Sequence, residues 1–302
     1  MSVLVGTDTK LIVQGMTGRA GTFYTDLATR YGTRVVGGVR PGKGGARHLG
    51  LPLFNTVAEA VTETGANASL VMVPPHNAAA AMIEAIEAEI GVAVCVTERV
   101  PVLDMLRVKS ALQGGYTELV GPNSQGVLAP DICKIGVMST SDAKQGIVGI
   151  VSRSASLTSE IVAQTSAAGF GQSTTIGVGG DPIHGIGFRR CLDLFRKDDG
   201  TKAVVLIGEI GGSEEEEAAE YLASIDYRKP VVSLVVGRHA PRERRMGHAG
   251  TLEIFRSATA TEKAKRLQAA GSIIASNVND VVPALREALA SPADRPLRRH
   301  VG

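Results

Sequence analysis

The chain has 302 residues, of which 44% are hydrophobic, so it is long enough to bury the cores of about two domains. Its 32 basic and 30 acidic residues nearly cancel, to a formal net charge of +2, which gives no reason to expect nucleic acid or a membrane surface as a partner. The longest apolar runs have the length of strands, so we expect no transmembrane helix.

In the first hundred residues, short β-branched runs alternate with alanine-rich amphipathic stretches. This alternation predicts an α/β protein with an open parallel sheet, because helices that connect parallel strands cover both faces of the sheet. The predicted strands are 10–15, 33–39, 68–74 and 92–97, and the predicted helices are 25–32, 56–65 and 77–89.

The alternation stops in a less regular stretch at 121–146, which holds two prolines and several turn residues. Such a stretch favours a domain boundary, and we place it between residues 126 and 127, so that the predicted domains are 1–126 and 127–302. The same pattern then restarts. The predicted strands are 146–152, 172–179, 203–211 and 230–237, and the predicted helices are 156–169, 188–198, 213–225 and 261–271.

Cysteine and histidine usage and the N-terminus bear on the compartment and on metals. The first ten residues lack a basic region followed by a long apolar stretch, so we expect no secretory signal. Cys95, Cys133 and Cys191 are scattered, and no two histidines have metal-ligand spacing. We therefore expect a cytoplasmic protein without a disulfide framework or a metal site.

The segment "GMTGRAG" (15–21) follows the first predicted strand. Its three glycines have the spacing of a loop that presents backbone amides and a helix N-terminus to a phosphate, although glycines at this spacing also serve tight turns alone. An NAD site would carry an acidic residue at the end of the second strand, about twenty residues on. Arg40 and Lys43 lie there instead, which argues against NAD and favours a more phosphorylated ligand.

Three strand ends in the second series carry polar groups. Ser152, Ser154 and Ser156 begin a predicted helix, where capping is the simplest interpretation. Glu209 ends a strand among glycines that leave it room to reach a partner, whereas the acidic run 214–217 is interpreted as a solvated helix start. In "GVGGDP" (177–182), Asp181 is a candidate helix cap.

His248 lies in "RRMGHAGT" (244–251), with glycines close on both sides and three arginines before it (Arg242, Arg244, Arg245). Glycines remove bulk around the ring, and arginines suit an anion. The segment alone leaves two interpretations open, a reactive histidine or a polar loop residue.

These segments occur together in one family. On "QGMTGRAGTF", "VVGGVRPGKGG", "VGPNSQGV", "GIVSRSASLT", "GFGQSTTIGVGGDPI", "IGEIGGSEEEEAAEY" and "RRMGHAG", the chain resembles the α subunits of succinyl-CoA synthetase and related ADP- or GDP-forming acyl-CoA ligases. The resemblance runs over nearly the whole length. It implies a Rossmann-like CoA-binding domain followed by a flavodoxin-like ligase domain.

The resemblance also implies the site residues. His248 corresponds to a histidine that becomes phosphorylated, and Glu209 to the glutamate that orients it. The residues implied for coenzyme A are Thr17, Gly18, Arg19, Ala20, Gly21, Lys43, Thr97 and Glu98. The nucleotide, ATP or GTP with Mg²⁺, is expected mainly on a β subunit with an ATP-grasp domain, in a heterodimer or heterotetramer.

The chain departs from the family where the acid substrate is expected. Ser124-Gln125 stands where the family usually has cysteine-proline, Ala155-Ser156 where it has glycine-threonine, and Ser159 where it has tyrosine. We expect Ser124, Ser154, Ser156 and Ser159 to contact the acid. Because sites that hydrogen-bond a substrate discriminate strongly against one without the matching group, succinate, another small (di)carboxylic acid, or a hydroxylated dicarboxylate such as malate all stay open.

Two other functions are alternatives to the ligase. One is a CoA-binding regulatory homologue without turnover, and the presence of both His248 and Glu209 counts against it. The other is a Rossmann oxidoreductase, which Arg40 and Lys43 oppose. The sequence leaves open ATP against GTP, the direction of the reaction and the number of αβ pairs.

Overall fold

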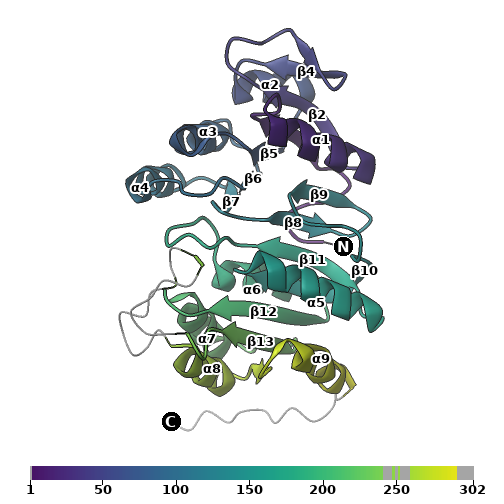
Figure 1. Ribbon diagram of the computed structural model, residues 1–302, viewed down its shortest axis with the longest axis vertical. Coiled ribbons are helices and arrows are strands. Elements are labelled where there is room, and N and C mark those ends of the chain that lie inside the picture. The colour runs from purple at the N-terminus through teal and green to yellow at the C-terminus, as the bar shows by residue number, and fades with distance from the viewer. Residues whose placement is uncertain (1, 241–246, 249–250, 252–258, 291–302) are drawn as a thin grey trace.

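The computed structural model describes residues 2–240, 247–248, 251 and 259–290. These residues form two α/β halves stacked along the longest axis of the molecule (Figure 1), and each half is built on one seven-stranded sheet.

The first sheet consists of β1 (Lys10–Gln14), β2 (Arg34–Val39), β3 (Arg47–His48), β4 (Leu51–Phe54), β5 (Ala68–Val71), β6 (Val92–Cys95) and β7 (Glu118–Val120). Its helices are α1 (Arg19–Tyr31), α2 (Val57–Thr64), α3 (Pro75–Glu87) and α4 (Val102–Ala111). The strand order is β3-β4-β2-β1-β5-β6-β7, and every neighbour pair except β3·β4 is parallel. Without the short strand β3, this is the Rossmann order, in which the chain winds outward from β1 in both directions.

The second sheet consists of β8 (Gly126–Ala129), β9 (Cys133–Gly136), β10 (Gln145–Ser152), β11 (Gln172–Gly177), β12 (Ala203–Glu209), β13 (Val231–Val236) and β14 (Ile273–Ile274). Its helices are α5 (Ala155–Ala167), α6 (Phe188–Lys197), α7 (Glu214–Ser224), α8 (Ala260–Ala269), the 3₁₀ helix η2 (Val278–Asp280) and α9 (Val281–Ala290). The parallel strands run β14-β13-β12-β10-β11, which is the flavodoxin order, and the antiparallel hairpin β8–β9 extends the sheet beyond β11. The prediction of a Rossmann-like half followed by a flavodoxin-like half is confirmed.

The structure corrects two local predictions. Helix α1 begins at Arg19, six residues before the predicted start at 25, because Gly21 is a helix residue that packs on the preceding turn. A Cβ at Gly21 would lie 2.2 Å from the carbonyl oxygen of Gly15. The stretch 121–146 is less irregular than expected, since it contains the hairpin β8–β9.

A continuous apolar core joins the two halves. One cluster of buried residues includes Val13 of β1 and Leu206 of β12. Polar contacts reinforce it: the Val3 amide donates to Thr174 Oγ1 at 3.0 Å, and the Thr33 hydroxyl exchanges hydrogen bonds with the backbone of Lys134 at 3.0 and 2.9 Å. In Figure 1 the hairpin β8–β9 lies between the halves, so the second sheet packs directly against the first half.

Two further findings concern cysteines and membranes. Cys95, Cys133 and Cys191 are free and buried, and burial raises the pKa of the Cys133 thiol to about 11 and that of Cys95 to about 12. These side chains are therefore protonated thiols at neutral pH. Within the described ranges, no helix is both long enough and apolar enough to cross a membrane.

Candidate active site

The candidate site lies at the carboxyl edge of the second sheet. Strand β10 pairs in parallel with β11 on one side and with β12 on the other. The chain therefore goes from β10 to β11 in one direction and then crosses back past β10 to β12 in the other. Open α/β sheets bind ligands at such a switch point, beyond the carboxyl ends of the strands. Ser152 ends β10 and Glu209 ends β12, which places both residues there.

His248 and Glu209, 39 residues apart in sequence, meet at this edge. His248 Nδ1 lies 2.7 Å from Glu209 Oε2. Because a carboxylate accepts, Nδ1 carries the proton and Nε2 is the ring nitrogen left for chemistry. The hydrogen bond to Glu209 raises the pKa of His248 above its ordinary value, and burial opposes this increase. Glu209 is 5% exposed and the His248 side chain 30%, so the pair combines a sheltered carboxylate with a reachable ring.

Arg153 joins His248 and Glu209 in a three-residue group. The sequence predicted no role for Arg153. Its Nε lies 2.9 Å from Glu209 Oε1 as an ion pair without hydrogen-bond geometry, and its side chain is 4% exposed. Its Nη2 donates to the carbonyl of Asp181 at 3.5 Å. The available signal was a single charged residue between two serines at the end of an apolar strand. The guanidinium offsets the negative charge of Glu209, which a buried carboxylate requires.

A cavity of about 320 Å³ opens beside His248. Its lining residues come from both halves of the chain: Glu98, Asn123, Gln125, Ser152, Arg153, Ala155, Gly177, Gly179, Gly247 and His248. The imidazole packs directly on backbone, since a Cβ at Gly180 would lie 2.5 Å from His248 Cγ. Gly177 similarly leaves room for Gln125, whose Cγ would lie 2.5 Å from a Cβ there.

Gln125 contributes a side-chain amide to the lining of this cavity. The residue is 7% exposed, yet its side-chain amide makes no hydrogen bond to any residue within the described ranges. The amide atoms of Gln125 are not sealed from solvent, so a ligand in the cavity can reach them.

The predicted substrate-binding serines have different environments. Ser154 is the N-cap of α5 and accepts from the Leu157 amide at 3.4 Å. Ser124 Oγ donates to the Gly177 carbonyl and accepts from the Gly126 amide at 2.8 Å, so it braces the strand ends.

The remaining two, Ser156 and Ser159, lie on the exposed face of α5. None of the four serines is among the lining residues of the His248 cavity. Ser156 Oγ lies 3.5 Å from Ser154 Oγ, and Ser159 Oγ donates to the Ala155 carbonyl at 3.3 Å. Ser159 lines a smaller hollow, which it shares with Gln125. Direct contact of the four serines with an acid stays a prediction.

The loop between β1 and α1 fits phosphate groups. Gly15 has φ of +86°, and a Cβ there would lie 2.5 Å from the Met72 carbonyl oxygen. Helix α1 follows Gly18, which has no side chain to cap it, so backbone amides at the helix start are open to an anion. Arg40 donates to the Thr17 hydroxyl, which keeps a cation beside the loop.

The other residues predicted for coenzyme A lie in loops at the same sheet edge, because β1, β2 and β6 are parallel to their neighbours. Lys43 is exposed in a loop that Asn55 orders by accepting from the amides of Gly42 and Gly44, both at 3.0 Å. Thr97 Oγ1 donates to the Val73 carbonyl at 2.7 Å. Glu98, the next residue, already lines the His248 cavity. One of the predicted CoA loops, the one that follows β6, therefore reaches the cavity beside His248.

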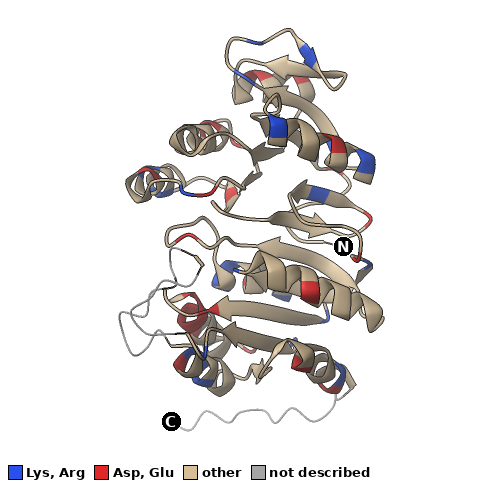
Figure 2. Cartoon of the chain, in the orientation of Figure 1, with Lys and Arg blue, Asp and Glu red and all other residues tan. Residues whose placement is uncertain are grey.

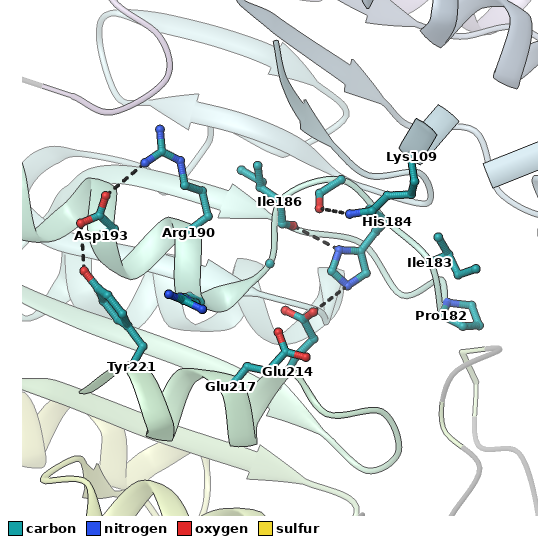
Figure 3. A pocket seen from close by; sticks show the side chains of 13 residues that line it. Lys109, Pro182, Ile183, His184, Ile186, Arg190, Asp193, Glu214, Glu217 and Tyr221 are labelled. Atoms are coloured by element: carbon teal, nitrogen blue, oxygen red, sulfur yellow. Dashed lines mark hydrogen bonds and ion pairs between the residues drawn. The ribbon is translucent and has the colours of Figure 1, made fainter. Parts of the chain in front are cut away.

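A larger hollow, of about 710 Å³, lies behind the loop that follows β11 (Figure 3). Its charged groups are engaged with protein. His184 lies between the Ile186 carbonyl at 3.2 Å and Glu214 at 3.3 Å, and Lys109 donates to the His184 carbonyl at 3.2 Å. Arg190 pairs with Glu118 and with Asp193. Few charged groups are left for a ligand, so the smaller cavity at His248 is the better candidate.

Two interpretations of the sequence are wrong at this edge. Asp181 does not cap a helix: α6 begins later, after Gly187, and Asp181 Oδ1 accepts from Asn123 Nδ2 at 3.0 Å. The acidic run 214–217 is not simply a solvated helix start, because Glu215 is 0% and Glu216 9% exposed. The three arginines before His248 lie outside the described residues.

Comparison with known proteins identifies both halves. A family model described as a CoA binding domain matches residues 6–99, and one described as CoA-ligase matches residues 151–273. The α subunit of ADP-forming succinate–CoA ligase from Aquifex aeolicus is 48% identical over 279 residues, which cover 92% of this chain and 91% of that protein. The corresponding subunit from Staphylococcus aureus is 48% identical over 288 residues, 95% of each chain.

Solved structures share the fold. ATP citrate lyase from Methanothrix soehngenii, in complex with citrate and coenzyme A, superposes with a TM-score of 0.83 at 22% identity. The match covers 95% of this chain, which spans about half, 50%, of that chain. A dinucleotide-forming acetyl-coenzyme A synthetase from Ca. Korarchaeum cryptofilum gives 0.73 at 17% identity, over 91% of this chain and 59% of that one. On the identity to its full-length relatives, the chain belongs to the succinate–CoA ligase α-subunit family, as a CoA ligase with a CoA-binding domain followed by a CoA-ligase domain.

Proposed function

We propose that the chain is the catalytic α subunit of an ADP-forming acid–CoA ligase that works through a phosphohistidine at His248. One observation carries this proposal: the His248–Glu209 pair opens into a cavity that also contains Glu98, from the strand end predicted to bind coenzyme A. A phosphate acceptor and the expected site of the thiol thus share one space.

In the proposed reaction, Glu209 holds the Nδ1 proton while Nε2 attacks the terminal phosphorus of the nucleotide. A P–N bond forms, the P–O bond to the leaving group breaks, and the nucleoside diphosphate takes that electron pair. Glu209 offsets the positive charge that develops on the ring. An oxygen of the acid then attacks phosphorus and frees His248, giving an acyl phosphate. The thiol of coenzyme A finally attacks the acyl carbon and forms the C–S bond, and phosphate leaves with the C–O electron pair and takes up the thiol proton.

Coenzyme A is proposed to lie along the carboxyl edge of the first sheet. The open amides at the start of α1, with Thr17, Gly18, Ala20 and Gly21, would hold a phosphate. Arg19 and Lys43 supply positive charge, and Thr97 and Glu98 continue the site toward His248. The matched CoA binding domain, residues 6–99, covers all of these positions.

The nucleotide and a partner complete the proposal. The relatives are named as alpha subunits of ADP-forming enzymes, which favours ATP and a β subunit. We propose that an ATP-grasp domain on that subunit holds the nucleotide with Mg²⁺, and that α and β associate as a heterodimer or heterotetramer.

The acid is proposed to be a small dicarboxylate. The relatives are named for succinate, but Gln125 offers an unpaired amide in the cavity, where a hydroxyl of the acid could bind. Such a hydrogen bond contributes about 1 kcal/mol. Gln125 therefore favours a hydroxylated dicarboxylate, malate for example.

A panel of acids tests this assignment. The chain, reconstituted with its β-type partner, is assayed for ADP release that depends on CoA with succinate, malate and related acids, scored by kcat/KM. We expect turnover, with malate ahead of succinate, and Ser159→Tyr moving preference back toward succinate. A lead of about tenfold for succinate would contradict the role of Gln125. CoA binding without turnover on any acid would indicate the regulatory homologue instead.

A further inference from the structure

A buried ion pair lies beneath the strand end that carries Glu209. Lys263 on α8 and Glu215 on α7 are both 0% exposed, and Lys263 Nζ contacts Glu215 Oε2. Figure 2 shows acidic residues at the start of α7, and two of them are buried, Glu215 at 0% and Glu216 at 9% exposure. The core thus holds a full charge pair that the proposed mechanism does not use.

The pair binds the backbone of Glu209 on both sides. The Glu209 amide donates to Glu215 Oε1 at 2.9 Å, and the Glu209 carbonyl accepts from Lys263 Nζ at 3.1 Å. Lys263 Nζ also donates to the Gly211 carbonyl. A Cβ at Gly208 would lie 2.3 Å from Glu215 Oε1, so a glycine leaves the space for this contact. The end of β12 is therefore fixed by side chains from two different helices.

A shift of this backbone would shift the carboxylate that holds His248. The Nδ1–Oε2 distance of 2.7 Å depends on where β12 ends, since Glu209 is its last residue. We infer that Lys263 and Glu215 are positioning residues for phosphate transfer, which hold Glu209 in place to orient the His248 ring. This inference rests on the proposed function and adds two residues to it.

The pair also belongs to a dense group of charges around His248. Within the described residues, the charged side chains around His248 and Glu209 are those of Arg153 after β10, Asp181 after β11, Glu98 after β6, Glu215 on α7 and Lys263 on α8. Glu216 on α7 lies 3.8 Å from Lys263. Burial raises the pKa of Glu215, and the ammonium of Lys263 opposes that increase. Removing one member of the pair alters both the position of Glu209 and the local charge.

A purely structural role is the alternative. Replacing one partner of a buried ion pair destabilises a protein because the other charge is left unpaired. Loss of stability alone would therefore not separate the two roles, and the test needs a readout at His248 itself.

The test compares three variants of the full chain. Glu215→Gln keeps the shape of the side chain and removes its charge. Lys263→Met keeps an unbranched side chain and removes the ammonium group. Lys229→Met is the matched control, because Lys229 also donates to backbone carbonyls, those of Phe195 (2.6 Å) and Asp198 (2.5 Å), at the opposite end of the sheet.

In complex with the β-type partner, Glu215→Gln and Lys263→Met should slow His248 phosphorylation at least about tenfold, while the KM for CoA stays within about twofold. NMR titration of His248 should show a lower pKa in Glu215→Gln, because a displaced Glu209 no longer raises it and one negative charge is gone. Lys229→Met should behave as wild type in both measurements.

Folded Glu215→Gln with a wild-type His248 pKa and phosphorylation rate would overturn the inference. That result stands even if Lys263→Met does not fold, which circular dichroism would reveal. A wild-type chain that takes no phosphate would overturn the proposed function, and this inference with it. Phosphorylated wild type with unaffected variants would overturn the inference alone.

Discussion

At the scale of single residues, the site is organised around one carboxylate. Glu209 Oε2 accepts a hydrogen bond from His248 Nδ1 at 2.7 Å, and Glu209 Oε1 lies 2.9 Å from Arg153 Nε. The histidine supplies a nucleophile and the arginine offsets the carboxylate. This arrangement gives Glu209 two tasks in the proposed reaction, to fix the ring tautomer and to offset the imidazolium charge.

The pH dependence of phosphorylation tests those tasks. The attacking ring must be neutral, so the rate should rise with pH through the pKa of His248, which Glu209 raises. Glu209→Gln removes the cause of the increase, so this rise should move to lower pH. The plateau should fall by about two to four orders of magnitude, as for other orienting groups.

Rapid-quench rates across a pH series provide this measurement. Glu217→Gln is the control, because it makes the same carboxylate-to-amide change at an exposed position on α7. It should leave the pH profile unchanged. A Glu209→Gln variant within about twofold of wild type at every pH would show that the carboxylate serves another purpose.

At the scale of elements, the regular alternation of strand and helix patterns made most of both sheets predictable. Elements with irregular local patterns could not be predicted. Helix α9 carries Pro283, which breaks helices in general but is tolerated in a first turn, so its sequence gave a weak signal. Helix α4 exposes Leu103 by 75% and Val102 by 51%, so apolar residues lie on both its faces and blur the amphipathic pattern. The hairpin β8–β9 consists of strands of four residues each, too short for a clear period.

The same scale explains which site residues could be predicted. His248, Glu209 and the loop before α1 carry local signals, such as flanking glycines or a strand end. Lys263 and Gly180 carry no such signal, because each matters through a contact with a distant segment. Lys263 contacts Glu209, 54 residues earlier in the chain, and Gly180 lies against His248, which is far along the chain from it. Such contacts follow from the packed fold and are not visible as a motif.

The charged residues in the loops of the first sheet are predicted to bind coenzyme A. Arg19 begins α1 and Lys43 follows β2, both at the edge where coenzyme A is proposed to lie. Neutralising them together, in Arg19→Gln/Lys43→Gln, should raise the KM for CoA far more than the KM for the acid, because the charges would meet phosphates.

Steady-state kinetics with each substrate varied in turn would check this. Arg30→Gln, at the opposite end of α1, is the matched control, since its charge pairs with Asp26 at 2.9 Å. Equal increases in both KM values would indicate that Arg19 and Lys43 only support their loops.

At the scale of the whole molecule, the two sheets contribute jointly to one site. Glu98 follows a strand of the first sheet, and His248 meets the edge of the second, yet both line the same cavity. The apolar core that runs through both halves packs them against each other. A ligand bound along the first half can thus be presented to chemistry carried by the second.

The central claim is that His248 carries phosphate during turnover. The most direct measurement incubates the chain and its β-type partner with γ-labelled ATP and maps the label. We predict label on this chain that is stable in alkali and labile in acid, located at His248 and discharged by CoA with the acid. His248→Asn should take no label while it still folds and binds CoA. Full labelling or full turnover in His248→Asn would contradict the account.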